Sequence, residues 1–285
     1  MANLHICNMI KSLFCLMFAT VFSVALLAQR LDVVNFISSD ESGFVSSYIL
    51  TSGKQSILVD APMCLKDIHR LIDTVIRLNR HLSGVFITHA HPDHYLGISE
   101  LRKAFPGIRV MASHEVALEI AKSGPATYDH FKTILGDQMP PPLVLPDSIV
   151  KNSLTLENCT LELISMQDGE SAYSTVLYEP KQKLLFSGDI VYSKVHLYLL
   201  EQRLDGWIHE LDELKSYKVL TIYPGHGKPA GMEVIEECIN YIHTFQMAIL
   251  TNDAVAIPDI MNYYFPGYVK IQYLKASVAK YLNTN

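Results

Sequence analysis

Three imidazoles and one carboxylate fall within six residues of this chain, a density of reactive side chains that is unusual for an apolar core. The segment is His89-Ala90-His91-Pro92-Asp93-His94. Imidazole and carboxylate groups together suit Zn²⁺ and the neighbouring first-row metal ions. The segment therefore predicts a metal site, provided that further ligands come from elsewhere in the chain.

A predicted strand and a predicted helix hold this cluster between them. The run from Gly84 to Ile87 is short and apolar, which favours a buried strand, and Leu96 to Phe105 has apolar residues at helical spacing. In the corner between them, His89 and His91 alternate out of the strand end toward the same side. Pro92 is tolerated in the first turn that follows. We expect the ligand-type side chains to converge from this one loop.

Three later corners of the chain carry further polar groups beside glycine. They are Gln167-Asp168-Gly169-Glu170-Ser171, Ser187-Gly188-Asp189 and Tyr223-Pro224-Gly225-His226-Gly227. Each one ends or interrupts a β-type run, and protein scaffolds commonly position ligands at such places. A bridging carboxylate and one more histidine would complete two neighbouring metal sites, an arrangement that serves hydrolysis.

Taken in order, these motifs resemble those of the metallo-β-lactamase superfamily. The resemblance rests on the His89–His94 cluster, on Gly188-Asp189 after an apolar strand and on Pro224-Gly225-His226-Gly227. It implies an α/β fold, a four-layer αβ/βα sandwich of two mixed sheets flanked by helices, with the metals at the sheet edges. It also implies ligand roles: His89 and His91 on the first metal, Asp93, His94 and His226 on the second, and Asp189 as the bridge.

One position departs from the pattern of the family. A histidine is usual nineteen residues before the bridging aspartate, and this chain has Glu170 there. A carboxylate also ligates Zn²⁺, so we expect Glu170 to be a ligand of the first metal. Its charge would weaken the Lewis acidity of the metal or favour a harder ion such as Mn²⁺ or Fe²⁺. The alternatives are that Glu170 points away, that Asp168 replaces it, or that the first site fills weakly.

Two further residues are candidates for catalysis beside Asp93, which is expected to orient the attacking water. Tyr192 resembles the tyrosine with which lactone-hydrolysing members of the family stabilise a carbonyl oxygen. The alternative is that it only fills space in the packing, as aromatic residues commonly do there. His196 either reaches the cleft as a substrate contact or extra ligand, or is a packed loop histidine. Asp60 either supports the histidine cluster from behind or starts a helix.

The beginning of the chain reads as a targeting segment. An apolar run from Leu13 to Ala28 follows Lys11, and this pattern is typical of a secretory signal, here residues 1–28. The alternative is a membrane anchor that the protein retains. We expect a periplasmic or secreted protein with no stable membrane association after cleavage. Residues 29–285 then form one domain with a core at about 43–250 and a helical tail at 251–285. The sequence does not decide whether a disulfide forms among Cys64, Cys159 and Cys238.

The remaining elements follow from periodicity. Gly43–Leu50 and Ser56–Asp60 predict a hairpin, and Ser113–Lys122 predicts a helix. Periodicity is lost from Gly124 to Pro146, which indicates a long connection that forms a lid or substrate wall. An antiparallel block is expected to begin at Ser148, and the aromatic tail is expected to pack onto the body.

These residues favour a metal-dependent hydrolase, with two Zn²⁺ per chain, that cleaves an amide, lactone or thioester of a small-molecule substrate. The alternatives are a single-iron oxygenase of the same superfamily and a non-catalytic metal-binding relative. The net charge of −6 and the scattered basic residues argue against a nucleic-acid partner. The sequence does not predict an oligomeric state.

Overall fold

The computed structural model of the protein describes residues 30–140 and 142–283. The expected signal segment, residues 1–28, lies outside the described residues. Within the described ranges no helix is long and apolar enough to cross a membrane. No disulfide joins Cys64, Cys159 and Cys238, which are all buried in this part of the chain.

Six strands form the first sheet, in the order β1-β2-β3-β4-β5-β6. Their bounds are Asp32–Ile37, Ser46–Ser52, Gln55–Val59, His81–Phe86, Arg109–Ala112 and Ser148–Ile149. Strands β1, β2 and β3 pair antiparallel, whereas β3 to β6 pair parallel, so the sheet is mixed. The predicted hairpin is confirmed as β2 and β3. Strand β1 was not predicted, because its mostly half-buried residues at the sheet edge show no clear alternation.

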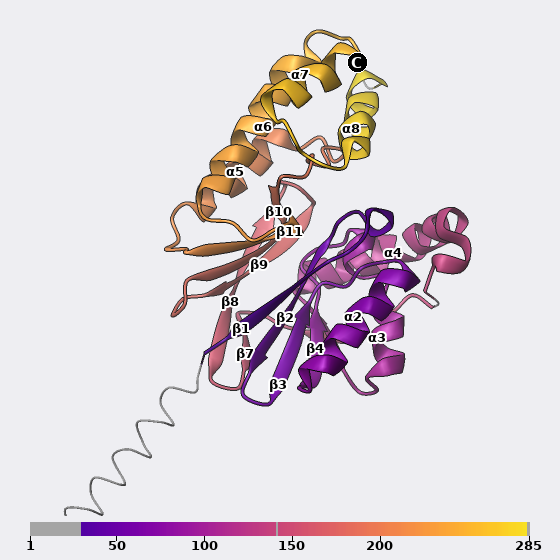
Figure 1. The fold of residues 1–285 in the computed structure, drawn as a ribbon, viewed down its shortest axis with the longest axis vertical. Coiled ribbons are helices and arrows are strands. Elements are labelled where there is room, and N and C mark those ends of the chain that lie inside the picture. The colour runs from indigo at the N-terminus through magenta and orange to yellow at the C-terminus, as the bar shows by residue number, and fades with distance from the viewer. Residues whose placement is uncertain (1–29, 141, 284–285) are drawn as a thin grey trace, which may run out of the picture.

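Helices α2, α3 and α4 cover the outer face of this sheet (Figure 1). They span Leu65–Leu78, Ile98–Ala104 and His114–Leu135. Helix α2 buries Ile68, Leu71, Ile72 and Val75, which share one face at helical spacing. Because α2 is the crossover between the parallel strands β3 and β4, its buried face packs back onto the sheet that it connects.

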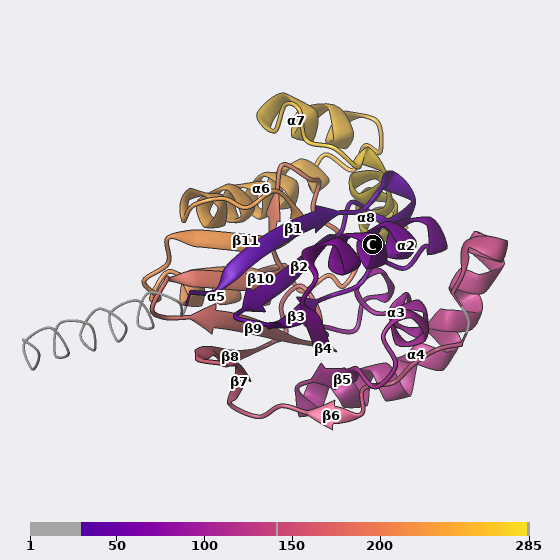
Figure 2. The ribbon, with the colours of Figure 1, turned by 60° about the horizontal axis from the view of Figure 1, so that its bottom comes forward.

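Five strands form the second sheet, in the order β11-β10-β9-β8-β7. In chain order, β7 to β11 span Ser153–Leu156, Cys159–Gln167, Tyr173–Glu179, Leu184–Ser193 and Thr221–Gly227. Helices α5 (Leu204–Leu214) and α6 (Glu233–Ile249) lie on its outer face, and the tail helices α7 (Ala256–Tyr264) and α8 (Ile271–Asn283) follow (Figures 1 and 2). The inner faces of the two sheets pack together, with the rings of Tyr48 on β2 and Phe186 on β10 at 5.6 Å. The expected four-layer αβ/βα sandwich is confirmed.

The structure corrects the predicted connection from Gly124 to Pro146. Helix α4 does not stop at Lys122 but continues through Pro125 to Leu135. Proline removes one helical hydrogen bond, yet Tyr128, Phe131 and Leu135 beyond it pack against the core of the first half. Their packing outweighs the local signal for a helix end.

Strand β6 also lies elsewhere than predicted. Ser148 and Ile149 pair parallel with β5 in the first sheet, so the antiparallel block begins only at β7. The aromatic tail packs onto the body as expected, with Ile257, Met261, Leu274 and Val278 in the core of the second half.

Candidate metal centre

Strand ends from both halves of the sandwich meet at one edge of the sheets. The loop after β4 carries the histidine cluster, and His89 forms a β-bridge with Ser174 of β9. On the other side, His226 of β11 forms a bridge with Val45, just before β2. These bridges bring groups that lie far apart in the chain to one place.

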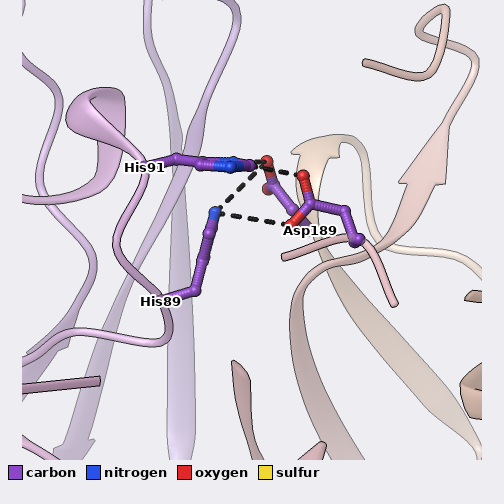
Figure 3. Close-up of side chains that lie close together, drawn as sticks. His89, His91 and Asp189 are labelled. Atoms are coloured by element: carbon purple, nitrogen blue, oxygen red, sulfur yellow. Dashed lines mark ion pairs between the residues drawn. The ribbon is translucent and has the colours of Figure 1, made fainter. Parts of the chain in front are cut away.

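Four ligand-type side chains form a first group there: His89, His91, Glu170 and Asp189. One ligand atom from each lies within 4.8 Å of the others. His91 Nδ1 is 3.1 Å from Glu170 Oε1, and His89 Nε2 is 3.5 Å from Asp189 Oδ2. Figure 3 shows the two imidazoles pointing toward the Asp189 carboxylate. This arrangement matches the ligands expected for a first metal.

Asp93, His94 and His226 form a second group, again with ligand atoms within 4.8 Å of one another. Asp189 also reaches this group, because its Oδ1 lies 3.1 Å from His94 Nε2 and its Oδ2 lies 3.2 Å from His226 Nε2. One carboxylate therefore faces both groups, as expected for a bridging ligand.

The buried polar atoms of the site show that these side chains fit a divalent cation. His89 Nε2, His94 Nε2, Asp189 Oδ1 and both carboxylate oxygens of Glu170 are buried without a hydrogen-bond partner. Leaving such atoms unpaired is costly, and native structures rarely do so. A cation in each group would satisfy them, because imidazole nitrogens and carboxylate oxygens are its preferred ligands.

Asp60 orients the ligands from behind. Asp60 directly follows β3, and its carboxylate accepts hydrogen bonds from the Thr88 backbone N–H at 2.9 Å and from the Thr88 hydroxyl at 2.8 Å. Its Oδ2 also lies 2.9 Å from His94 Nδ1, which leaves His94 Nε2 to face the site. Of the two roles open to Asp60, the structure shows the supporting one. Gly43 acts similarly, because its carbonyl oxygen is 2.8 Å from His226 Nδ1.

The site carries an excess of negative charge. Burial alone would lower the pKa of His91, but the Glu170 and Asp189 carboxylates outweigh it and raise that pKa well above its ordinary value. Burial is likewise outweighed for His94 and His226, where Asp189 is the largest cause of a raised pKa. Burial would raise the pKa of Asp189, but the surrounding imidazoles, His226 foremost, hold it well below its usual range. The field of the site thus favours bound positive charge.

Comparison with known proteins identifies the superfamily of this chain. Residues 41–226 match the family model described as the metallo-beta-lactamase superfamily. The chain belongs to this superfamily. The matched range ends at His226 and includes every residue of both ligand groups.

Two relatives among known proteins share about a quarter of the aligned residues with this chain. A beta-lactamase-like protein 2 homolog of Caenorhabditis elegans is 25% identical over 205 residues, 69% of this chain and 60% of the relative. An atrochrysone carboxyl ACP thioesterase of Cryptosporiopsis sp. is 26% identical over 183 residues, 64% of this chain and 48% of the relative. The chain thus spans about half to three fifths of the length of these relatives.

Solved structures share the fold. A metallo-beta-lactamase family protein from Thermus thermophilus superposes with a TM-score of 0.65 at 18% identity, covering 89% of this chain and 92% of that one. A beta-lactamase domain protein from Burkholderia ambifaria gives a TM-score of 0.63 at 16% identity, over 89% and 85% of the two chains. At these identities the match shows the metallo-beta-lactamase fold alone.

The glutamate that departs from the family pattern points into the site. Its side chain is buried, with 1% of Glu170 exposed, whereas the side chain of Asp168 is 81% exposed and pairs with Arg203. Of the alternatives open from sequence, the structure therefore places Glu170 with the other ligand-type side chains and Asp168 outside the site. Glu210 of α5 lies directly behind, where its Oε2 accepts from the Glu170 backbone N–H at 3.4 Å. Burial, reinforced by Glu170, raises the pKa of Glu210 to about 8.

Tyr192 and His196 occupy different positions. The Tyr192 hydroxyl donates to Asp189 Oδ2 at 2.8 Å, and its ring stacks on His226 at 4.7 Å. The structure does not bring His196 to the cleft. Its backbone N–H donates to Val269 O, and its ring packs against Tyr241 and Tyr268, so it is the packed loop histidine of the two alternatives. Burial lowers its pKa to about 4.

A cleft of about 480 Å³ opens onto the ligands. One wall is a face of α4, where Glu119, Ser123, Thr127 and Phe131 recur at every fourth position. The opposite wall comes from the loop after β10 and from α8 with the residue before it, which contribute Tyr198, Leu200, Glu201, Arg203, Lys270 and Tyr273. Sequence reasoning did not identify Tyr198 and Tyr273 as site residues. For Tyr273 the clustered tyrosines of the tail were the only signal, and they equally predict packing; no signal pointed to Tyr198.

Proposed function

We propose that this superfamily member is a hydrolase that uses two zinc ions to cleave a carbonyl-containing bond of a small molecule, an amide, lactone or thioester. The observation that carries the proposal is the Asp189 carboxylate, which faces both ligand groups. Two metals a few Å apart clamp the attacking and leaving groups of a hydrolytic reaction. The thioesterase among the relatives supports the thioester as one substrate class.

Metal ions bound here would lower the pKa of a water molecule toward neutrality and polarise the carbonyl oxygen of the substrate. Asp93 would orient that water; its position on the cleft wall, with its Oδ2 3.6 Å from His226 Nε2, supports this role. Water adds to the carbonyl carbon and the bond to the leaving nitrogen, oxygen or sulfur breaks. The products are a carboxylic acid and the protonated leaving group.

Export is part of the proposal. The apolar run from Leu13 to Ala28 supports a cleaved signal and a periplasmic or secreted enzyme. Sequencing the N-terminus of the protein recovered from its native compartment tests this. A mature terminus near residue 29 supports export, and an intact Met1 in the cell contradicts it.

The test of the hydrolase combines metal analysis with a substrate panel. Protein purified without added metal is expected to hold about two zinc ions and to hydrolyse at least one of a set of thioesters, lactones and β-lactams. Asp93→Asn is expected to reduce kcat by at least about 100-fold, because a positioned acid–base group contributes about 10²–10⁴-fold. A wild-type kcat in Asp93→Asn would contradict the proposed mechanism.

A specific feature favours a second candidate, a single-iron oxygenase. His89, His91 and Glu170 make up two histidines and one carboxylate, the ligand set of many non-haem iron oxygenases. One iron per chain together with consumption of O₂ would favour this function. Bound metal with neither hydrolysis nor O₂ consumption would indicate a non-catalytic metal-binding protein.

A further inference from the structure

Two tyrosines of the cleft, Tyr192 and Tyr273, approach the ligand groups, and they differ in how firmly their hydroxyls are held. Tyr192 is 1% exposed and donates to Asp189 Oδ2 at 2.8 Å, a short bond to a charged acceptor. Its single proton is thereby directed to a ligand carboxylate. The phenol of Tyr192 therefore supports Asp189 from within the protein.

Tyr273 reaches the same site from α8. Its hydroxyl lies 3.4 Å from Gly43 O and 3.5 Å from Asp93 Oδ2. Both distances are well beyond the usual range of about 2.5–3.0 Å for an O–H···O bond. The proton of Tyr273 is therefore available to a better acceptor in the cleft, which Tyr273 lines together with Asp93.

The backbone at Gly43 makes room for this hydroxyl. Gly43 has a φ of 77°, and a Cβ there would lie 2.2 Å from the Tyr273 hydroxyl and 2.9 Å from Asp93 Oδ2. Only glycine fits between the two groups without displacing one of them. The phenol, the carboxylate and the Gly43 carbonyl thus form one closely packed corner of the site.

The tail holds Tyr273 in this place. Ser277, one turn further along α8, donates to Tyr273 O at 2.8 Å and accepts from Leu199 N–H at 2.9 Å. Lys270 binds Asp40 Oδ1 at 2.9 Å, in the loop that precedes Gly43. The ring of Tyr273 lies edge-on to His226 at 5.7 Å and to Tyr198 at 5.1 Å. These contacts fix a side chain that lies beyond the part of the chain matched by the family model.

We propose that Tyr273 is a catalytic residue that donates a hydrogen bond to the substrate carbonyl oxygen as that oxygen gains negative charge. The inference rests on the proposed hydrolase function. Tyr273 keeps its proton throughout, so the water that adds to the carbonyl and the bond that breaks are those already described. A donor aimed at a developing oxyanion acts mainly on the transition state, so its loss reduces kcat more than it raises KM.

The experiment compares Tyr273→Phe with Tyr268→Phe in the full zinc-loaded chain. Tyr268 is a matched control because it is a tail tyrosine whose hydroxyl donates to Glu237 Oε2 at 3.2 Å, outside the cleft. For the fastest thioester or lactone of the panel, Tyr273→Phe is expected to lower kcat by about 10- to 100-fold with KM within about threefold. Tyr268→Phe is expected to retain wild-type kinetics.

A second readout does not depend on turnover. Calorimetric binding of a phosphonate analogue of that substrate is expected to weaken at least about tenfold in Tyr273→Phe, because the analogue resembles the charged transition state. Metal content and melting temperature are expected to stay at the wild-type values.

Each contrary result has one meaning. Wild-type kcat and phosphonate affinity in Tyr273→Phe would overturn the role of Tyr273 while leaving the hydrolase intact. Loss of metal or of folding in Tyr273→Phe would make the phenol a structural support for Asp93 and would also overturn the proposal. A wild-type protein that hydrolyses nothing in the panel would overturn the proposed function itself.

Discussion

Glu170 Oε1 lies 3.1 Å from His91 Nδ1, with both side chains directed into the metal site. This carboxylate occupies the place where a histidine is usual in the family. A negatively charged ligand in place of a neutral one is expected to shift the preference of the first group toward harder metal ions.

Removing the charge of Glu170 is expected to empty the first group selectively. Glu170→Gln keeps the shape of the side chain but provides a poor ligand, so metal affinity at one site is expected to fall by at least about tenfold. Elemental analysis after dialysis is expected to show about one metal ion fewer per chain. The matched control is Asp168→Asn, two residues away, whose carboxylate is exposed. Loss of metal in the control instead would assign the ligand to Asp168.

Asp60→Asn tests the support behind His94. The amide accepts fewer hydrogen bonds than the carboxylate and no longer holds His94 with Nε2 toward the site. Metal affinity is expected to fall about 10- to 100-fold, as is typical of such supporting groups. Asp67 is a suitable control because it is equally buried and accepts from Ser39 and Arg70 at a distance from the ligands. Asp67→Asn is expected to reduce the melting temperature and leave metal affinity unchanged. Equal metal affinity in Asp60→Asn and Asp67→Asn would contradict the role of Asp60.

The metal-free protein is expected to lose stability as the pH rises above neutrality. The pKa values of His91, His94 and His226 are raised in the folded state, so their contribution is complete below the unfolded value of about 6.5 and disappears as the pH rises through the folded values. The pKa of Asp189 is lowered, so its contribution is present above the unfolded value of about 3.8 and lost as the pH falls through the folded value.

Melting temperatures with a chelator and with zinc, from about pH 3 to 9, test this. The chelated protein is expected to be most stable between about pH 4 and 6.5. The zinc-loaded protein is expected to gain stability with rising pH over the measured range, because ligands must lose their protons to bind metal. Parallel curves for the two forms would contradict the charge balance described for the site.

Phe131→Ala tests the cleft wall on α4. Phe131 lines the cleft and is also packed against the core of the first half. For substrates with an apolar group the variant is expected to raise KM about tenfold with little change in kcat, since burying an aromatic ring contributes about 1.5–3 kcal/mol. Ile134→Ala, one turn further and 59% exposed, is the control and is expected to keep the wild-type KM. A fall in kcat at constant KM would show that Phe131 does not bind substrate.

The side chains of the candidate metal centre could be predicted from the sequence because the ability to bind a metal depends on chemical type. His89, His91 and Asp189 stand at strand ends or bulges, and β4 and β10 bring them to one edge of the sandwich. Hydrophobic runs and glycine-containing corners are local signals, so most strands and helices followed from them, whereas the edge strand β1 and the pairing of β6 did not. Helix α4 shows their limit, because packing of Phe131 and Leu135 carried the helix past Gly124 and Pro125.

By itself the sequence predicted which side chains gather at the candidate metal centre and showed the departure at Glu170, and its resemblance to the superfamily predicted the αβ/βα sandwich. Only the tertiary structure decided which way ambiguous groups face: Asp60 lies toward His94, and His196 packs against Tyr241 of α6 and Tyr268 of the tail. It also brought Tyr273 to Asp93 across 180 positions of the chain. No local pattern encodes such a contact, because α8 packs into the core of the second half while the Tyr273 hydroxyl reaches Gly43 and Asp93 of the first half.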